Sequence, residues 1–252
     1  MLELENINYS VEDKQILRDI NLRVEDRFVA VTGPNGSGKS TLLKIIMGIL
    51  TPDSGRVLLD GEDITALPIH ERANRGISFA FQQPVRFKGL RVRDLLGLAG
   101  GKGKNAKQQF SHACDILSEV GLCARDYIDR ELNDTLSGGE MKRIEIAMAA
   151  ARGAKLTLFD EPEAGIDLWS FQSLIHVFEN LYRETAGSIL IISHQERILN
   201  IADRIIYLKN GAVERYDEGK KVLDALELNL QPSACEVIAA KAAPCERGRE
   251  LR

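Results

Sequence analysis

The residues with the most recognisable chemistry lie in one short stretch of the chain. They are Gly33, Pro34, Asn35, Gly36, Ser37, Gly38, Lys39, Ser40 and Thr41. This order matches the phosphate-binding pattern G-x-x-x-x-G-K-[S/T], in which glycines let backbone N–H groups turn toward an anion. In that pattern Lys39 reaches the β- and γ-phosphates of a nucleotide, and the Ser40 hydroxyl binds Mg²⁺. The stretch therefore predicts a nucleotide site that uses Mg²⁺.

Two neighbouring carboxylates follow a different apolar run. Asp160 and Glu161 come directly after residues 156–159, which are typical of a buried strand. A carboxylate placed opposite a phosphate-binding loop can hold Mg²⁺, directly or through water, and we assign that role to Asp160. Glu161 is then in place to polarise an attacking water. Acidic pairs at strand ends are commonly just solvated, but the presence of Lys39 and Ser40 favours the functional interpretation.

Two further polar residues end apolar strands. Gln82 follows residues 76–81, and His194 follows residues 188–193. Ligands of open α/β sheets bind at the carboxyl ends of the strands, where these side chains would meet Asp160 and the loop at Gly33. We expect Gln82 to reach Mg²⁺ and the attacking water, and His194 to sense the γ-phosphate.

Tyr9 ends the first expected strand and allows two interpretations. It is either a half-buried strand aromatic or a face on which a nucleobase stacks. A second ambiguous stretch is the helix start at residues 136–140. Ser137 and Glu140 form a capping box there, while Gly138 and Gly139 leave helix N–H groups open, as a phosphate site would.

The elements that position these residues indicate an α/β fold. Period-two patterns at residues 1–24 and 56–60 predict an antiparallel patch beside a P-loop NTPase core. Residues of about 85–150 predict an inserted helical subdomain, within which residues 97–104 are expected to form a surface loop. We expect one ATPase domain over 1–230 and a C-terminal tail over 231–252.

Composition excludes several classes of protein. The 252 residues are 44% hydrophobic and carry a net charge of −4, which argues against nucleic-acid binding by bulk electrostatics. The sequence has no apolar run of the roughly 18–20 residues that a membrane span requires, so direct membrane insertion is not expected. The scattered cysteines indicate reduced thiols and a cytoplasmic location. Cys235 and Cys245 are expected to be free thiols, with a labile metal or cluster site as the alternative.

Together these motifs resemble an ABC-type ATPase over about residues 1–225, and the signature at 136–140 is the most specific part of the resemblance. The resemblance implies that ATP is hydrolysed with Mg²⁺ by two protomers packed head to tail. Ser137 and Gly139 of one protomer would then close on the γ-phosphate held by Lys39 of the other. Asp167 matches the family's aspartate at the dimer contact.

Finer features resemble the soluble ATPase of the Suf-type iron–sulfur cluster assembly machinery. They are the strings at residues 79–85 and 193–199 and the loop at 165–167. This resemblance implies a soluble iron–sulfur scaffold as the partner. The alternative is the ATP-binding subunit of a membrane transporter, with a transmembrane partner. A non-catalytic nucleotide-binding module is disfavoured because Glu161 and His194 are both present.

Overall fold

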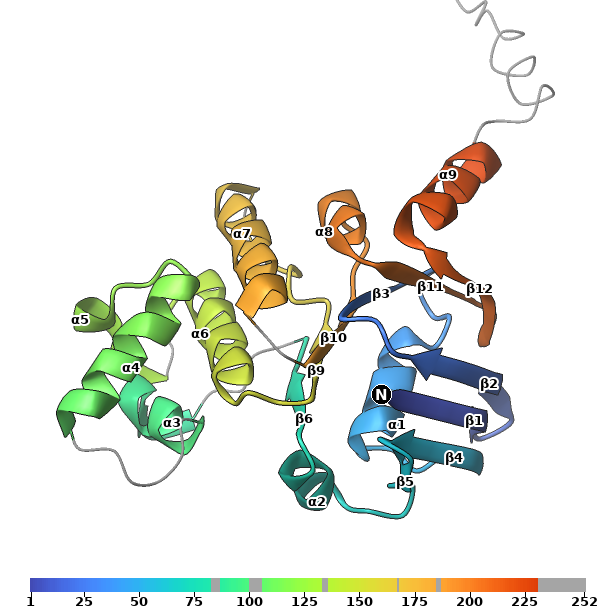
Figure 1. The fold of residues 1–252 in the computed structure, drawn as a ribbon, viewed down its shortest axis with the longest axis horizontal. Coiled ribbons are helices and arrows are strands. Elements are labelled where there is room, and N and C mark those ends of the chain that lie inside the picture. Colours follow the sequence, from blue (N-terminus) through green and yellow to red (C-terminus); the bar gives the residue numbers. More distant parts are fainter. Residues whose placement is uncertain (83–86, 100–105, 133–135, 167, 185–186, 231–252) are drawn as a thin grey trace, which may run out of the picture.

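The fold was obtained as a computed structural model. It describes residues 1–82, 87–99, 106–132, 136–166, 168–184 and 187–230. Its centre is a six-stranded sheet with the order β12-β11-β3-β10-β9-β6 (Figure 1). The strands are β3 (Phe28–Thr32), β6 (Ile77–Ala80), β9 (Leu156–Asp160), β10 (Ser188–Ile192), β11 (Arg204–Lys209) and β12 (Ala212–Glu218). Neighbouring strands pair in parallel except β11 and β12, which form an antiparallel hairpin.

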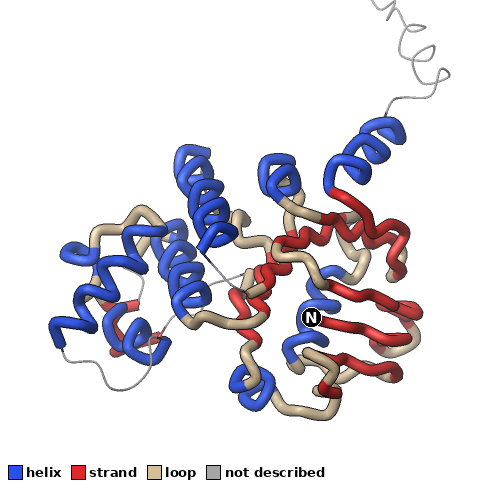
Figure 2. Tube along the Cα trace, in the orientation of Figure 1, coloured by secondary structure: helices blue, strands red, loops and turns tan. Residues whose placement is uncertain are grey.

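A second, antiparallel sheet lies beside this core. Its order is β2-β1-β4-β5, and its antiparallel pairing is as the alternating sequence pattern predicts. The strands are β1 (Leu2–Val11), β2 (Lys14–Val24), β4 (Ser54–Leu59) and β5 (Glu62–Asp63). Together with the six-stranded sheet and its helices, this sheet confirms the expected α/β fold with a flanking antiparallel part (Figure 2).

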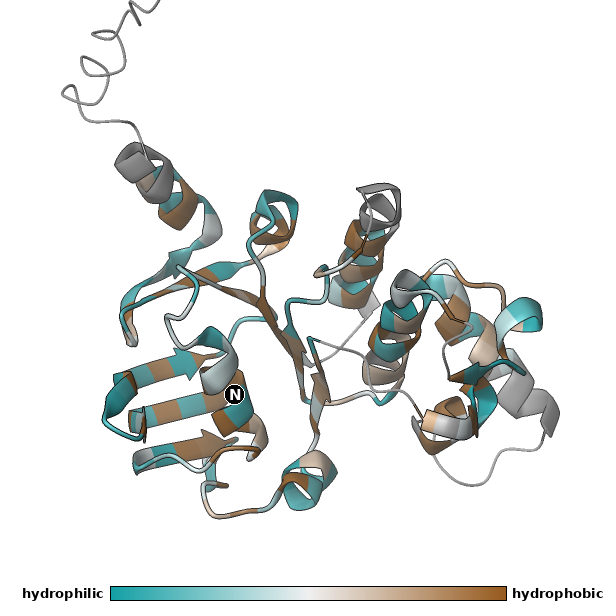
Figure 3. Ribbon diagram, turned by 180° about the vertical axis from the view of Figure 1, so that it is seen from behind, coloured by the Kyte–Doolittle hydropathy of each residue, from teal (hydrophilic) through white to brown (hydrophobic). Residues whose placement is uncertain are grey.

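Alternation along the central strands divides the interior into two cores. In β3, Phe28 and Ala30 belong to one core, while Val29 and Val31 belong to the other. The first core contacts helices α6 (Gly138–Ala151), α7 (Leu168–Glu184), α8 (Glu196–Ile201) and α9 (Gly219–Leu230). The second contains α1 (Lys39–Met47) and the antiparallel sheet. Apolar residues accordingly dominate the central strands (Figure 3). Because the sheet is buried on both faces, its strand ends are the part available for polar chemistry.

A helical lobe lies to one side of the central sheet (Figure 1). It contains α3 (Val92–Ala99), α4 (Ala106–Glu119), α5 (Ala124–Tyr127) and α6, with the short antiparallel pair β7 (Phe87–Arg91) and β8 (Glu131–Leu132). The sequence pattern predicted α4 but not the β7–β8 pair. The expected surface loop at 97–104 is wrong at its start, because α3 continues through Ala99, and residues 100–104 lie outside the described part.

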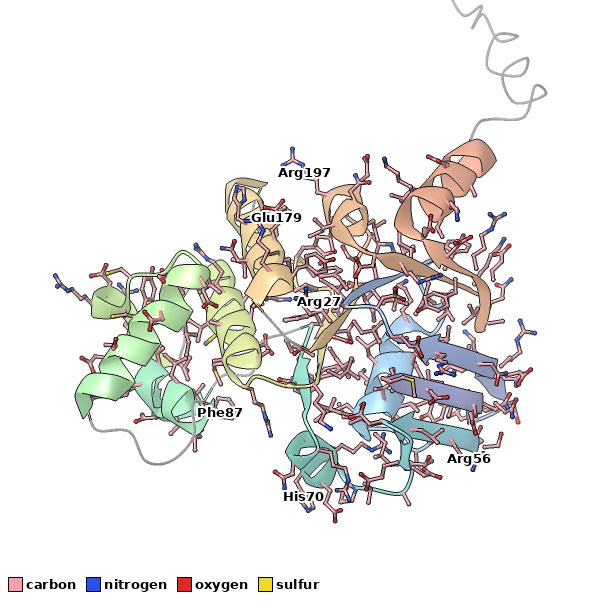
Figure 4. All side chains as sticks on the ribbon, viewed as in Figure 1. Arg27, Arg56, His70, Phe87, Glu179 and Arg197 are labelled. Atoms are coloured by element: carbon pink, nitrogen blue, oxygen red, sulfur yellow. The ribbon has the colours of Figure 1, made fainter. Side chains whose placement is uncertain are left out.

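Helix α2 (Ile69–Asn74) contributes a buried guanidinium to the core. Arg72 is 1% exposed and donates hydrogen bonds to the carbonyl oxygens of Ile45 and Ile46, at the C-terminal end of α1. A cation at that end of a helix satisfies orphan carbonyl groups and complements the helix dipole. His70 on the same helix is exposed (Figure 4).

Across the described residues, no helix is both long and apolar enough to cross a membrane.

Candidate functional site

The loop between β3 and α1 is held open by glycines. Gly33, Gly36 and Gly38 have φ values of 142°, 77° and 101°, which side chains rarely adopt. A Cβ at Gly33 would lie 1.9 Å from the Leu208 carbonyl oxygen, so the loop also passes very close to β11. Gly38 caps α1 without a side-chain hydrogen bond, which leaves the first N–H groups of the helix free to bind an anion.

Lys39 lies across this loop. It is 5% exposed, and its Nζ donates to the carbonyl oxygens of Gly33 and Pro34 at 2.8 and 3.0 Å. Burial lowers the pKa of Lys39, while the charges of Glu161 and Asp160 act in the opposite direction. The ammonium is therefore held within the loop by two backbone carbonyl oxygens.

Ser40 and Asp160 form the expected oxygen pair. The Ser40 hydroxyl donates to Asp160 Oδ1 at 2.9 Å, and Asp160 is 3% exposed at the end of β9. Burial raises the pKa of Asp160, and the Ser40 hydrogen bond only partly opposes this effect. Hard cations prefer oxygen ligands, and a divalent ion here would stabilise the buried carboxylate, so this pair fits Mg²⁺. Ser37 Oγ is also buried and has no hydrogen-bond partner among the described residues, which fits a loop built to receive a polar ligand.

Glu161 is in contact with the two other polar strand ends. Gln82 Nε2 donates to Glu161 Oε2 at 2.8 Å, and His194 Nε2 lies 3.8 Å from Glu161 Oε1. Glu161 has a φ of 46°, a strained conformation that is commonly retained at functional sites. Burial lowers the pKa of His194, and the positive charge of Lys39 lowers it further, so the imidazole is biased toward its neutral form.

Some of these groups line a cavity of about 430 Å³, but Asp160 and His194 are not among the described residues that line it. Its lining includes Lys39, Ser40, Gln82 and Glu161. A neighbouring cavity of about 330 Å³ shares Lys14, Ile16 and Gly36 with it. The two together offer room for a phosphate chain and for the rest of a nucleotide beside it.

Tyr9 does not belong to the described lining of either cavity. It is paired with Leu17 and packs, partly buried, against the core beneath the antiparallel sheet. Lys14 and Ile16 line both cavities instead, and sequence reasoning missed them. Their only signal is indirect, because they follow the turn between β1 and β2 and carry no motif.

The capping box at the start of α6 is confirmed. Ser137 N–H donates to Glu140 Oε2 at 2.7 Å, and Glu140 N–H donates to Ser137 Oγ at 3.2 Å. Tyr127 adds a bond that the sequence did not suggest, since its hydroxyl donates to Glu140 Oε1 at 2.5 Å. The same bond is the main cause that lowers the pKa of Glu140.

The signature residues lie apart from the cavity in this single chain. Ser137 and Gly139 are not among the described residues that line it, and Ser137 is exposed on the helical lobe. Asp167 lies outside the described residues, as do Cys235 and Cys245.

A third cavity, mostly apolar and of about 380 Å³, lies between β6 and the helical lobe. Phe81, Phe87 and Leu98 line it and remain 40%, 40% and 77% exposed. Phe87 lies on the edge of the lobe nearer to β6 (Figure 4). Large exposed side chains gathered at one cavity commonly indicate an interaction surface.

Comparisons with known proteins agree with this geometry. The family model described as ABC transporter matches residues 17–164. An uncharacterized ABC transporter ATP-binding protein, MJ0035 of Methanocaldococcus jannaschii, is 37% identical over 88% of this chain and 90% of its own length. The lipopolysaccharide export system ATP-binding protein LptB of Haemophilus influenzae is 33% identical over 84% of this chain and 88% of its own. A dimeric post-hydrolysis structure of the ATP-binding cassette MJ0796, bound to ADP and Pi, superposes with a TM-score of 0.76. It is 28% identical and covers 86% of this chain and 98% of that one.

Proposed function

The chain belongs to the ABC transporter family of ATPases, and we propose that it is the ATP-binding subunit that powers a membrane transporter. The names of the two relatives described above support a transporter role better than the expected iron–sulfur scaffold. The observation that carries the catalytic part is a single cavity lined by Lys39, Ser40, Gln82 and Glu161.

The proposed chemistry is positioning together with charge neutralisation. Ser40, Asp160 and Gln82 would hold Mg²⁺, which would supply positive charge to offset that of the phosphates. The Lys39 ammonium exchanges its two loop carbonyls for phosphate oxygens. Glu161 accepts a proton from the attacking water, and His194 contacts the γ-phosphate.

We propose that the site is completed by a second copy of the chain. Ser137 and Gly139 of that copy would supply open N–H groups to the γ-phosphate, and Asp167 would lie at the contact. The exposure of Ser137 on the helical lobe supports this arrangement, as does the dimeric state of the similar cassette MJ0796. Binding energy between two ATP molecules and both copies would then stabilise the closed dimer.

The apolar cavity at Phe81, Phe87 and Leu98 is the proposed docking surface for the transmembrane partner. Within this proposal, residues 1–230 are the ATPase domain, about 85–150 its helical subdomain and 231–252 a tail. The chain would work at the cytoplasmic side and reach the membrane only through its partner.

A second candidate is the ATPase of Suf-type iron–sulfur cluster assembly. The strings at residues 79–85 and 193–199 favour it, although residues 83–86 lie outside the described part. The two candidates share the ATPase site and differ only in the partner.

Purification of the tagged chain from its own cell under anaerobic conditions separates them. A polytopic membrane subunit that co-purifies would support the transporter role. A soluble scaffold that carries iron and sulfide would replace it with the assembly role. Phe87→Asp should release the partner while the isolated chain still hydrolyses ATP, and a Phe87→Asp variant that retains the partner would rule out the docking surface.

A further inference from the structure

Glu163 lies two residues after Glu161, in the loop that follows β9, and has no role in the chemistry above. Its Oε1 accepts a hydrogen bond from the Ser193 hydroxyl at 2.5 Å and a weaker one from the His194 N–H at 3.4 Å. Ser193 is 0% exposed, and its Oγ in turn accepts the Gln195 N–H at 3.0 Å. One carboxylate therefore organises the whole turn that carries His194.

The surroundings of Glu163 make a carboxylate destabilising at this position. Its Oε2 is buried and has no hydrogen-bond partner among the described residues. Burial raises the pKa of Glu163, and the charge of Glu161 raises it further. The ammonium of Lys142 on α6 is close enough to interact with it electrostatically. A carboxylate with one unpaired buried oxygen costs stability that an apolar residue would not.

We propose that Glu163 is a positioning residue that fixes the turn at His194 relative to the loop of Glu161. Apart from Glu163, these two loops are joined by the strand pairing of Ile192 with Asp160 and by the Glu161 N–H, which donates to the Ile192 carbonyl at 3.2 Å. Those backbone contacts place the strand ends, and the Ser193 N–H adds a bond to the Val31 carbonyl at 3.2 Å. The Ser193 hydroxyl and the His194 N–H take their support from a side chain instead. Glu163 supplies that support from the same loop that carries the catalytic carboxylate.

The consequence concerns the 3.8 Å separation between His194 Nε2 and Glu161 Oε1. Both groups must act around one water and one phosphate, and a misplacement of about 1 Å can cost on the order of 100-fold in rate. Glu163 keeps this separation small without touching the substrate. The inference rests on the proposed roles of Glu161 and His194, and its test therefore includes a readout that needs no hydrolysis.

The kinetic test compares Glu163→Ala with Glu163→Gln. Alanine should lower kcat by about 10- to 100-fold and change the KM for ATP by less than about twofold. Glutamine keeps an oxygen that can accept both bonds and should retain kcat within about threefold. Ser193→Ala should reproduce the loss. The double variant should be no slower than the slower single variant, because both changes remove the same hydrogen bond between Ser193 and Glu163. Wild-type kcat in Glu163→Ala, or fully additive losses in the double variant, would overturn the proposal.

The second readout is the titration of the His194 ring, followed by NMR in the chain without nucleotide. In Glu163→Ala the turn loosens and the ring gains water, so the pKa of His194 should rise toward its ordinary value of about 6.5. Glu179→Ala is the matched control, because Glu179 lies on α7 beside the exposed His176, away from the cavity (Figure 4). It should alter only the His176 signal. An unchanged His194 titration in both Glu163→Ala and Ser193→Ala would refute the positioning role even if the chain proved to have no ATPase activity.

Discussion

The loop at 33–41 and the helix start at 136–140 are the two proposed anion-binding structures, and they are built by different means. The first is shaped by its backbone, with glycines pressed against β11 and β2 and a lysine held by loop carbonyls. The second is held by side chains, since Glu140 bonds to both Ser137 and Tyr127 on the helical lobe. A backbone cradle is fixed by the fold of its own domain. The hydrogen-bonded group of Ser137, Glu140 and Tyr127 lies within the helical lobe, so it can move with that lobe and keep its shape.

Because of this difference, we expect the two regions to act in different states of the protein. The first should bind nucleotide within one chain, whereas the second should act only when another copy presents it. Changes in the first region should therefore harm binding or chemistry in every state of the protein. Changes in the second should spare the isolated chain and stop turnover.

Glu161→Gln should give the largest effect, because it removes the proposed base and leaves both anion-binding structures intact. Loss of a general base costs about 10²- to 10⁴-fold in kcat. ATP should still bind, and the variant should accumulate as a dimer on size exclusion with ATP and Mg²⁺. Undiminished turnover would remove Glu161 from its proposed role.

Gly139→Asp should come next and should separate the two regions most sharply. A Cβ at Gly139 meets nothing within 4 Å, so the single chain should fold with wild-type stability. A carboxylate at the phosphate-binding face should lower turnover at least about tenfold through charge repulsion, while nucleotide still binds to the isolated chain.

The matched change in the other region is Gly38→Ala. It would place a Cβ 2.6 Å from Leu17 Cδ2 at a φ of 101° and should lower both stability and nucleotide affinity.

Mixing variants tests whether the two regions come from different copies. Lys39→Ala and Gly139→Asp chains should each be inactive alone. A mixed dimer contains one intact site, with Lys39 from one chain and Gly139 from the other, so mixing should restore part of the activity. If the mixture stays as inactive as its components, the head-to-tail arrangement is wrong.

Tyr127→Phe should have a smaller effect, because it removes only the hydrogen bond to Glu140 and keeps the aromatic ring. The loss of a bond to a charged group costs about 1.5–3 kcal/mol at most, and less where the carboxylate is partly exposed. Because this carboxylate is partly exposed, we expect kcat to fall by only about twofold to fivefold, with unchanged nucleotide affinity in the isolated chain. A lower affinity for nucleotide would instead indicate that the helix start at 136–140 supports the loop at 33–41 within the same chain.

The smallest effect concerns acid stability. The Tyr127 hydroxyl lowers the pKa of Glu140 below its ordinary value, so this bond stabilises the fold above the unfolded pKa of about 4.3. That contribution is lost as pH falls through the lower, folded pKa of Glu140. The unfolding free energies of the wild-type chain and Tyr127→Phe, measured in urea, should therefore differ at pH 7 and converge toward pH 3. A constant difference would assign the effect to packing.

Sequence patterns predicted the parts of the site that follow from local order. Lys39 and Ser40 are fixed by their own loop, and Asp160 is fixed by the strand that precedes it. The patterns missed side chains whose partners are remote in sequence or carry no motif. Tyr127 meets Glu140 only because the helical lobe folds back, and Arg72 reaches the end of α1 from another helix. Glu163 lies between two recognised motifs, but its role depends on a strand that comes about thirty residues later, and only the structure brings them together.

Lys39 also bears on how the chain exchanges nucleotide. Its ammonium has two oxygen acceptors in its own loop, at Gly33 and Pro34. When a product leaves, the buried Lys39 ammonium therefore keeps hydrogen-bond acceptors. When the next nucleotide binds, phosphate oxygens replace these carbonyl oxygens. Because the same loop supplies these acceptors, exchange of nucleotide should require a short swing of one side chain rather than a change of the backbone.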